Sequence, residues 1–129
     1  MRAQALRRLT RLRSIAGIKV FDDNPSRQGT WPFLLLLLPD QVRRDAALAP
    51  LWSAGLGVSR LFIHALPDYA YLAPIVPPQD LPHARDFAAR RLSISISISV
   101  NVSVSVSNSL WMTDEDSETI CHKLEGSLG

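Results

Sequence analysis

A two-residue repeat occupies residues 92–109 and restricts what this chain can form more than any other feature. Every second position from Ile94 to Val106 is Ile or Val, and the positions between them are Ser, with one Asn. Side chains alternate between two faces along a β-strand, so a strand would place seven Ile or Val side chains on one face. The same period scatters apolar residues around a helix. The repeat therefore predicts a long β-strand over residues 92–108.

The repeat also predicts self-association. It contains no charge, no Pro and no Gly, and a slip of two residues restores the same pattern, so its register is not fixed. Segments of this composition stack into cross-β assemblies. The other strand-like segments, Phe33–Leu38 and Val58–Leu66, do not alternate to match it. We expect copies of the chain to associate through Ile94–Val106, and we interpret the run as a translated nucleotide repeat.

Charge is distributed unevenly along the 129 residues, although the net charge is only +2. The first twenty residues hold six basic groups and no acid, whereas the last twenty hold five acids and one Lys. One cysteine, Cys121, excludes an internal disulfide and a zinc site built from several cysteines. Asn101 begins an N-glycosylation pattern that matters only in a secreted chain, and we do not expect secretion.

The basic segment at residues 1–21 favours an amphipathic helix. Its apolar face would consist of Ala5, Leu9, Leu12 and Ala16, with arginines opposite. This composition is typical of a mitochondrial targeting sequence, and equally of a surface helix for anionic lipid or of a solvated terminus. Nucleic acid is not the expected partner, because the segment has no aromatic residue to stack on bases. Localisation stays open between mitochondrion and cytoplasm.

Residues 33–66 carry the strongest fold signal. Phe33–Leu38 is typical of a buried strand, and Val58–Leu66 of a second one. Between them, Asp40 is typical of the N-cap of a helix that Pro50 kinks or ends. Strand, helix and strand at this spacing predict one βαβ unit. The apolar run that begins it is too short to cross a bilayer, and we predict no transmembrane segment.

After residue 66 the sequence predicts a linker and two helices. Five prolines in residues 67–82 indicate an extended linker. Asp80 is a candidate cap for a short helix over residues 83–91. Thr113 is a candidate cap for a C-terminal helix that ends at Gly126. The thin apolar face of that helix consists of Ile120, Cys121 and Leu124.

As a whole, the sequence predicts an α/β-like fragment that is only partly ordered. It combines the βαβ unit at 33–66, the low-complexity strand at 92–108 and short flanking helices. The expected segments are a basic amphipathic segment at 1–21, the βαβ region at 22–66, a Pro-rich linker at 67–82, a short helix at 83–91, the Ser-Ile/Val strand at 92–109 and an acidic helix or tail at 110–129.

Acidic residues give the most specific catalytic hypothesis, because they follow three candidate strands, namely Gly17–Phe21, Phe33–Leu38 and Val58–Leu66. They are Asp22, Asp23, Asp40 and Asp68. In a parallel α/β sheet the carboxyl ends of the strands line the ligand crevice, where clustered carboxylates bind Mg²⁺. The competing interpretation is that Asp beside Pro forms ordinary turns and caps. No glycine-rich phosphate loop accompanies the acids.

The remaining candidates are single residues. Ser93 and Thr113 lie in patterns typical of kinase sites. We interpret His64 as a hydrogen-bonded core residue. Cys121 and His122 are adjacent, so on a helix they diverge too far to act as a catalytic pair. We predict no catalytic residue among these and no cofactor.

Three functions stay open at this point. The first is a small protein without an evolved catalytic or binding site and without an identifiable specific partner. The second is a truncated or divergent α/β enzyme with the carboxylate Mg²⁺ site. The third is a mitochondrially targeted interaction protein whose basic head acts as the address.

Overall fold

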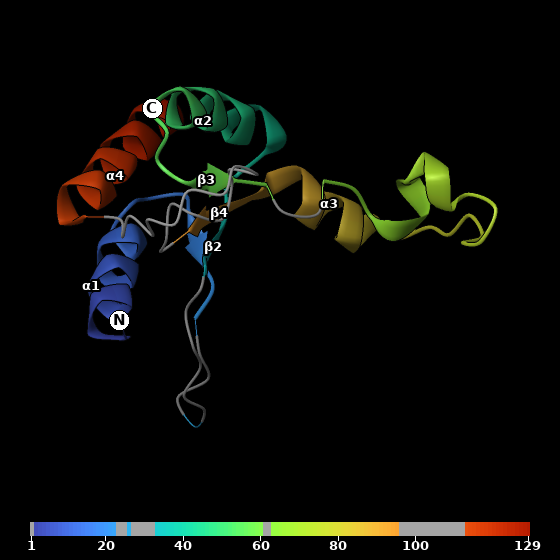
Figure 1. Cartoon of the computed structure of the whole chain (residues 1–129), viewed down its shortest axis with the longest axis horizontal. Coiled ribbons are helices and arrows are strands. Elements are labelled where there is room, and N and C mark those ends of the chain that lie inside the picture. Colours follow the sequence, from blue (N-terminus) through green and yellow to red (C-terminus); the bar gives the residue numbers. More distant parts are fainter. Residues whose placement is uncertain (1, 23–25, 27–32, 61–62, 96–112) are drawn as a thin grey trace, which may run out of the picture.

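A four-stranded antiparallel sheet organises the part of the chain that the computed structural model describes, namely residues 2–22, 26, 33–60, 63–95 and 113–129 (Figure 1). The strands lie in the spatial order β1–β2–β4–β3, and helices accompany them in a mixed α/β structure. In chain order the described elements are α1 (Arg2–Arg13), β1 (Lys19–Val20), β2 (Phe33–Leu37), α2 (Gln41–Ser53), β3 (Val58–Ser59), the short 3-10 helices η1 (Leu66–Asp68) and η2 (Ala70–Leu72), α3 (Pro82–Arg90), β4 (Arg91–Ser95) and α4 (Asp114–Leu128).

One face of the sheet carries the core. Opposed residues in adjacent strands lie on the same face, so the pairing of Leu34 with Ile94 and of Leu36 with Leu92 defines that face. β3 extends it, because Val58 also pairs with Ile94. All five side chains are buried. The sheet is therefore continuous across its centre, with β4 as an interior strand.

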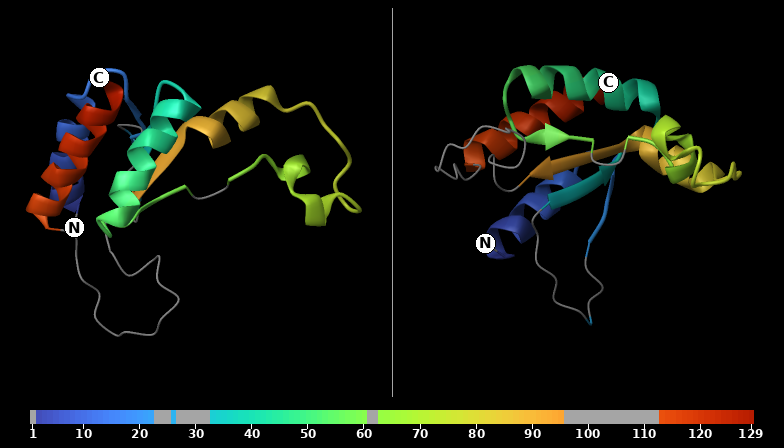
Figure 2. Two further views of the ribbon diagram at one scale, coloured as in Figure 1. Left: turned by 90° about the horizontal axis from the view of Figure 1, so that it is seen from above. Right: turned by 45° about the vertical axis from the view of Figure 1, so that its right-hand side comes forward.

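Three helices supply the other half of the core. Figure 2 shows α1 beside α4, and α4 packs in turn against α2. Their buried side chains join those of the sheet in one cluster, and they are Ala5, Leu9 and Leu12 from α1, Ala47, Leu48 and Leu51 from α2, and Ile120, Cys121 and Leu124 from α4. The predicted apolar faces of the two terminal helices are confirmed at these positions. The prediction is wrong for Ala16, which is exposed and lies beyond the end of α1 at Arg13.

The βαβ prediction for residues 33–66 is confirmed in part. β2, α2 and β3 follow one another, and both strands pair antiparallel with β4, so they run in the same direction. They do not touch each other, however, because β4 lies between them. The reason is that β4 presents an alternating strand whose apolar face continues the faces of both neighbours. The second strand is also shorter than predicted, at Val58–Ser59.

Of the two outcomes predicted at Pro50, a kink or an end, the end does not occur, because Pro50 lies inside α2 and the helix continues to Ser53. Proline removes one backbone donor, but buried Leu48 and Leu51 anchor the helix in the core on either side of that position. The start of α2 is as predicted. The Asp40 carboxylate accepts a hydrogen bond from the Arg43 backbone N–H at 2.8 Å.

Only the start of the Ser-Ile/Val repeat belongs to a described element, strand β4. Residues 96–112 lie outside the described residues, so the long predicted strand is not shown. Within β4 the predicted alternation is confirmed, because Leu92 and Ile94 face the core and Ser93 lies on the opposite face. The two strand-like segments that were not expected to match the repeat contain the strands that flank β4, namely β2 and β3.

The two later helices differ from their predicted limits. α3 begins after Leu81 with no side-chain cap, and not at Asp80. α4 begins with the predicted cap at Thr113, which forms a capping box with Asp116, but the helix continues past Gly126 to Leu128. Partly buried Leu128 packs against the core and so holds that last turn in place.

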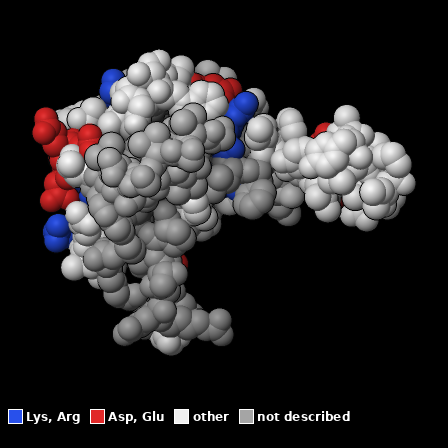
Figure 3. Space-filling view, viewed as in Figure 1, with Lys and Arg blue, Asp and Glu red and all other residues white. Residues whose placement is uncertain are grey.

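Residues 63–81 form an arm between β3 and α3, which projects from the sheet in Figures 1 and 2. An extended linker was predicted here, but η1 and η2 lie within it, so its backbone is partly coiled. The arm exposes Leu66, Tyr71 and Ile75. Figure 3 accordingly shows it as a mostly uncharged surface.

Candidate functional site

A cleft of about 530 Å³ lies where the arm joins α2 and α3. Three arginines, one histidine and a single carboxylate line it, together with apolar side chains. We call it the arginine cleft, and its residues are Gln41 and Arg44 from α2, Arg60, Ile63, His64 and Ala65 from the segment after β3, Asp68 from η1, and Arg85, Ala88 and Ala89 from α3.

Arg44 is the buried arginine of this cleft, with 2% of its surface exposed. Its guanidinium donates hydrogen bonds to the Asp45 carboxylate at 2.7 Å and to the Ala88 carbonyl at 3.3 Å. A longer contact of 3.5 Å reaches the Arg91 carbonyl. These bonds fasten α2 to the end of α3 and the start of β4, and Asp45 compensates the charge of the guanidinium.

Arg85 holds the two ends of the arm together. Its Nε and Nη2 donate to the two carboxylate oxygens of Asp68, each at 2.8 Å, in the bidentate geometry that suits this pair. The same guanidinium donates to the Gln79 carbonyl at 3.0 Å and contacts Asp80 at 3.3 Å. The hydrogen bonds from Arg85 lower the pKa of Asp68 below its usual value. Both charges are therefore engaged with each other.

Arg60 differs from the other two arginines. Within the described residues it forms no ion pair, and its Nε is buried without a hydrogen-bond partner. Because Asp45 and Asp68 compensate Arg44 and Arg85, the positive charge of the cleft is concentrated at Arg60.

The sequence did not single out any of these arginines. One signal was present at Arg44, which precedes Ala47, Leu48 and Leu51 at the spacing of one helical face. A charged residue on an apolar face indicates a buried and partnered side chain. Arg60 and Arg85 carried no comparable signal, because their neighbours in the cleft come from distant segments.

The predicted carboxylates are placed apart. Asp22 forms an ion pair with Arg13, Asp40 caps α2, and Asp68 belongs to the arginine cleft. β1 and β2 are antiparallel, so their carboxyl ends lie at opposite ends of the pair and not along one crevice. Among the described residues no group of three or more His, Cys, Asp or Glu side chains is arranged to hold a metal ion. Asp23 lies outside those residues, and the four-carboxylate site stays a prediction.

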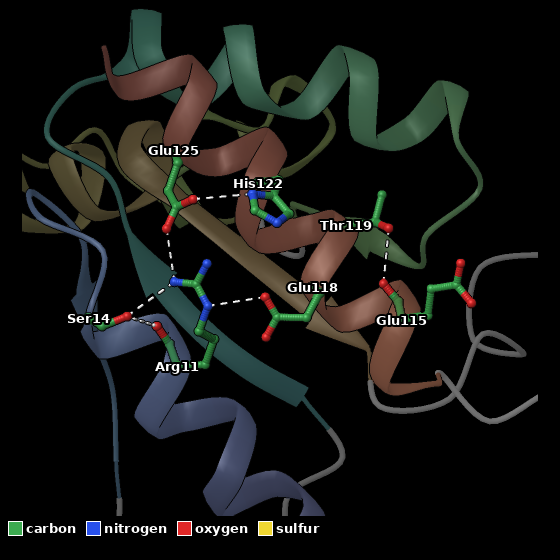
Figure 4. Close-up of polar contacts among 7 residues, drawn as sticks. All are labelled: Arg11, Ser14, Glu115, Glu118, Thr119, His122 and Glu125. Atoms are coloured by element: carbon green, nitrogen blue, oxygen red, sulfur yellow. Dashed lines mark hydrogen bonds and ion pairs between the residues drawn. The ribbon is translucent and has the colours of Figure 1, made fainter.

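A second polar cluster joins the two terminal helices (Figure 4). The Arg11 guanidinium, from α1, donates to Glu118 at 3.2 Å and to Glu125 at 2.8 Å, both on α4. The hydrogen bond from Arg11 lowers the pKa of Glu125. A smaller cavity of about 250 Å³ beside this cluster is lined by Arg7, Arg8, Arg11, Asp114, Ser117 and Glu118. The basic head and the acidic tail of the sequence therefore meet in the fold.

The other predicted site residues have structural surroundings that sequence patterns did not show. Ser93 is fully buried and donates a hydrogen bond to the Ser59 carbonyl at 2.8 Å, so a kinase would reach it only if β4 left the sheet. The Thr113 hydroxyl accepts from the Asp116 N–H at 3.1 Å in the α4 capping box. Phosphorylation at either residue stays a prediction.

The structure corrects the predicted surroundings of His64 and confirms that Cys121 lies on a buried helix face. The interpretation of His64 as a core residue is wrong, because it is exposed and its ring lies 5.3 Å from that of Tyr69, edge to face. Cys121 is buried in the core, and burial raises the pKa of its thiol to about 11. A thiol in this state is a poor nucleophile at neutral pH.

The helices in the described ranges are not long and apolar enough for any of them to cross a membrane, as the sequence predicted.

Comparison with known proteins gives a structural likeness. No protein-family model and no curated protein matches the chain. Among solved structures, the chain is similar to the aminotransferase TlmJ from Streptoalloteichus hindustanus, with a TM-score of 0.66 and 20% sequence identity. The match covers 98% of this chain but only 30% of that one. At this identity the likeness shows the fold alone, and it is compatible with a divergent α/β enzyme fragment.

Proposed function

We propose that this chain provides a small α/β domain of an aminotransferase-type enzyme, where it binds and positions a ligand and does not complete the transfer chemistry. The observation that carries the proposal is the extent of the structural match, which takes in 98% of the chain and 30% of a longer aminotransferase. A match of that extent includes the sheet, the interposed β4 and the helices together, and not a single recurring motif.

The arrangement of the described side chains supports a binding role. The ionisable groups converge in a cleft dominated by arginine, whereas the one buried thiol has a pKa raised to about 11. Arginine side chains stay protonated and recognise anions, and they are poor proton donors or nucleophiles. A fold by itself does not assign an activity, so the proposal needs a functional test.

A domain graft tests the proposal. This chain would replace the matched 30% of the aminotransferase TlmJ, and the solubility and amino-transfer rate of the graft would be measured. A second graft, with an unrelated α/β domain of the same length, serves as the control. We expect the first graft to be soluble and to transfer amino groups faster than the control.

Two outcomes would overturn the proposal. If the two grafts are equally insoluble or equally inactive, the structural likeness does not reflect a shared role, and the chain does not act as a domain of such an enzyme. If the isolated chain transfers amino groups by itself, its role is catalytic and not limited to binding. A graft with Leu36→Asp, which places a charge in the buried sheet, should be insoluble and shows that a folded domain is required.

A further inference from the structure

We propose that a cavity between α1 and α4 binds a small inorganic oxyanion that carries a single negative charge. The cavity has a volume of about 250 Å³, and we call it the terminal-helix cavity. Figure 2 shows the two helices side by side. Three arginines of α1 and three polar side chains of α4 line the cavity, namely Arg7, Arg8, Arg11, Asp114, Ser117 and Glu118. These residues do not belong to the arginine cleft, so the inference does not rest on the proposed function.

The charges that line the terminal-helix cavity do not cancel. The Arg11 guanidinium is held by a hydrogen bond to Glu118 at 3.2 Å (Figure 4). The guanidiniums of Arg7 and Arg8 lie against the same carboxylate, that of Asp114. Its oxygens are 3.6 Å and 3.7 Å from the two guanidiniums, which is longer than a hydrogen bond. Of the lining charges three are positive and two are negative, so one positive charge is in excess.

Arg8 carries its charge at the buried side of the cavity, since only 4% of its surface is exposed. Burial lowers the pKa of this guanidinium below its usual value, although the neighbouring Asp114 acts in the opposite direction. The cationic form is therefore unfavourable where it lies, because burial removes water from it. An anion in the cavity would stabilise it, since attraction between charges strengthens where water is partly excluded.

The hydroxyl of Ser117 is a second and independent indication of a ligand. This side chain lines the cavity and is 9% exposed. Its hydroxyl has no hydrogen-bond partner among the residues that the structure describes. Most buried polar side chains do have such a partner, because a buried donor without an acceptor is unfavourable. A ligand oxygen in the cavity would accept this hydrogen bond.

The lining also restricts the kind of ligand. Guanidinium and hydroxyl groups donate hydrogen bonds, so the ligand must offer several acceptor oxygens. A single negative charge balances the excess positive charge, whereas the second charge of a dianion would meet the carboxylates of Asp114 and Glu118. The six lining side chains are all polar, so they provide no apolar surface for an aliphatic body. Nitrate and bicarbonate are ions of the required class.

Titrations of the full chain with nitrate, sulfate and hexanoate test the proposal. Binding would be followed by amide chemical shifts, with chloride as the background electrolyte at constant ionic strength. We expect saturable binding of nitrate at millimolar concentration, with the largest shifts around Ser117 and Arg8. Sulfate should bind at least about tenfold more weakly because of its second charge. Hexanoate should bind no more tightly than nitrate, because its aliphatic body gains nothing from a polar lining.

Replacement of the Ser117 hydroxyl locates the ion. Ser117→Ala should raise the dissociation constant of nitrate at least about threefold, the effect of losing one hydrogen bond. The urea midpoint should not fall, because the hydroxyl has no partner among the described residues. Ser127→Ala is the matched control: it makes the same change on α4 outside the cavity, and it should leave nitrate binding unchanged.

Replacement of an arginine tests the charge. Arg7→Gln should raise the dissociation constant of nitrate at least about tenfold, the effect of losing a charge-assisted contact. The Arg7 side chain is 64% exposed, so its replacement does not disturb the core as that of buried Arg8 would. Lys123→Gln removes one positive charge from α4 outside the cavity, and it should leave nitrate binding unchanged.

Several results would overturn the inference. Equal nitrate binding by the parent chain, Ser117→Ala and Arg7→Gln would place the ion elsewhere. Tighter binding of sulfate than of nitrate would mean that the cavity does not select a single charge. Tighter binding of hexanoate would assign the site to apolar acids. Nitrate shifts that spread over the chain without saturation would show general attraction to arginine and no binding site.

Discussion

Replacing Ile94 with alanine tests whether β4 is an interior strand. Ile94 is 2% exposed and pairs with Leu34 on one side and Val58 on the other. It is also the first Ile of the Ser-Ile/Val repeat. A repeat that contributed nothing to the fold would tolerate the change, whereas an interior strand of a sheet would not.

The expected loss of stability follows from what the substitution removes. Isoleucine has three more side-chain carbons than alanine, and burial of each contributes about 0.8 kcal/mol, so the transfer part is about 2.4 kcal/mol. The cavity left beside Leu34 and Val58 adds to this, which gives a total of about 3–4 kcal/mol. Domains of this size are stable by about 5–15 kcal/mol, so the variant should fold but with a large part of its stability lost.

Urea unfolding followed by far-ultraviolet circular dichroism measures this loss. We expect the midpoint to fall by about 1.5–2 M at an unchanged slope of about 2 kcal/mol per molar urea. Ile75→Ala is the matched control, because it makes the same chemical change on the arm, where Ile75 is 79% exposed. The control should change the free energy of unfolding by less than about 0.5 kcal/mol. Equal effects of the two substitutions would refute the interior position of β4.

Three further predictions concern the ends of the chain and the repeat. Arg11→Gln should make the free energy of unfolding depend less on pH in the acid range. The hydrogen bond from Arg11 lowers the pKa of Glu125, so the stability that it contributes is complete above the ordinary pKa of 4.5 and is lost as pH falls through the lowered pKa. Thermal melts between pH 7 and 3 check it, and parallel curves for variant and parent would contradict it. Cys121, with its pKa raised to about 11, should react slowly with a thiol reagent in the native chain and rapidly in urea, and equal rates would mean that the core is open. Ile98→Lys combined with Val102→Lys should suppress assembly of the chain, measured by thioflavin fluorescence and light scattering, and aggregation as fast as the parent's would show that the repeat is not the driver.

The candidate site was harder to predict than the helices. Asp40 was recognised as a cap, because capping depends on residues within one turn. The convergence of Arg60 with Arg85 was not, because the two are brought together only by the return of the arm toward α3. The carboxylate hypothesis rested on a parallel sheet, whereas β1 pairs antiparallel with β2; Asp23 lies outside the described residues, and the site stays a prediction.

By itself, the sequence determined the features that arise from neighbouring residues. These are the alternation of Leu92, Ser93 and Ile94, the apolar faces of α1 and α4, and the capping box at Thr113. The tertiary structure decided which strands pair, since β2 and β3 gain more by flanking β4 than by pairing with each other. It also brought the basic α1 against the acidic α4 through Arg11. The physical reason is that a period or a cap is fixed by local geometry, whereas the choice of partner depends on competition among all apolar faces of the chain at once.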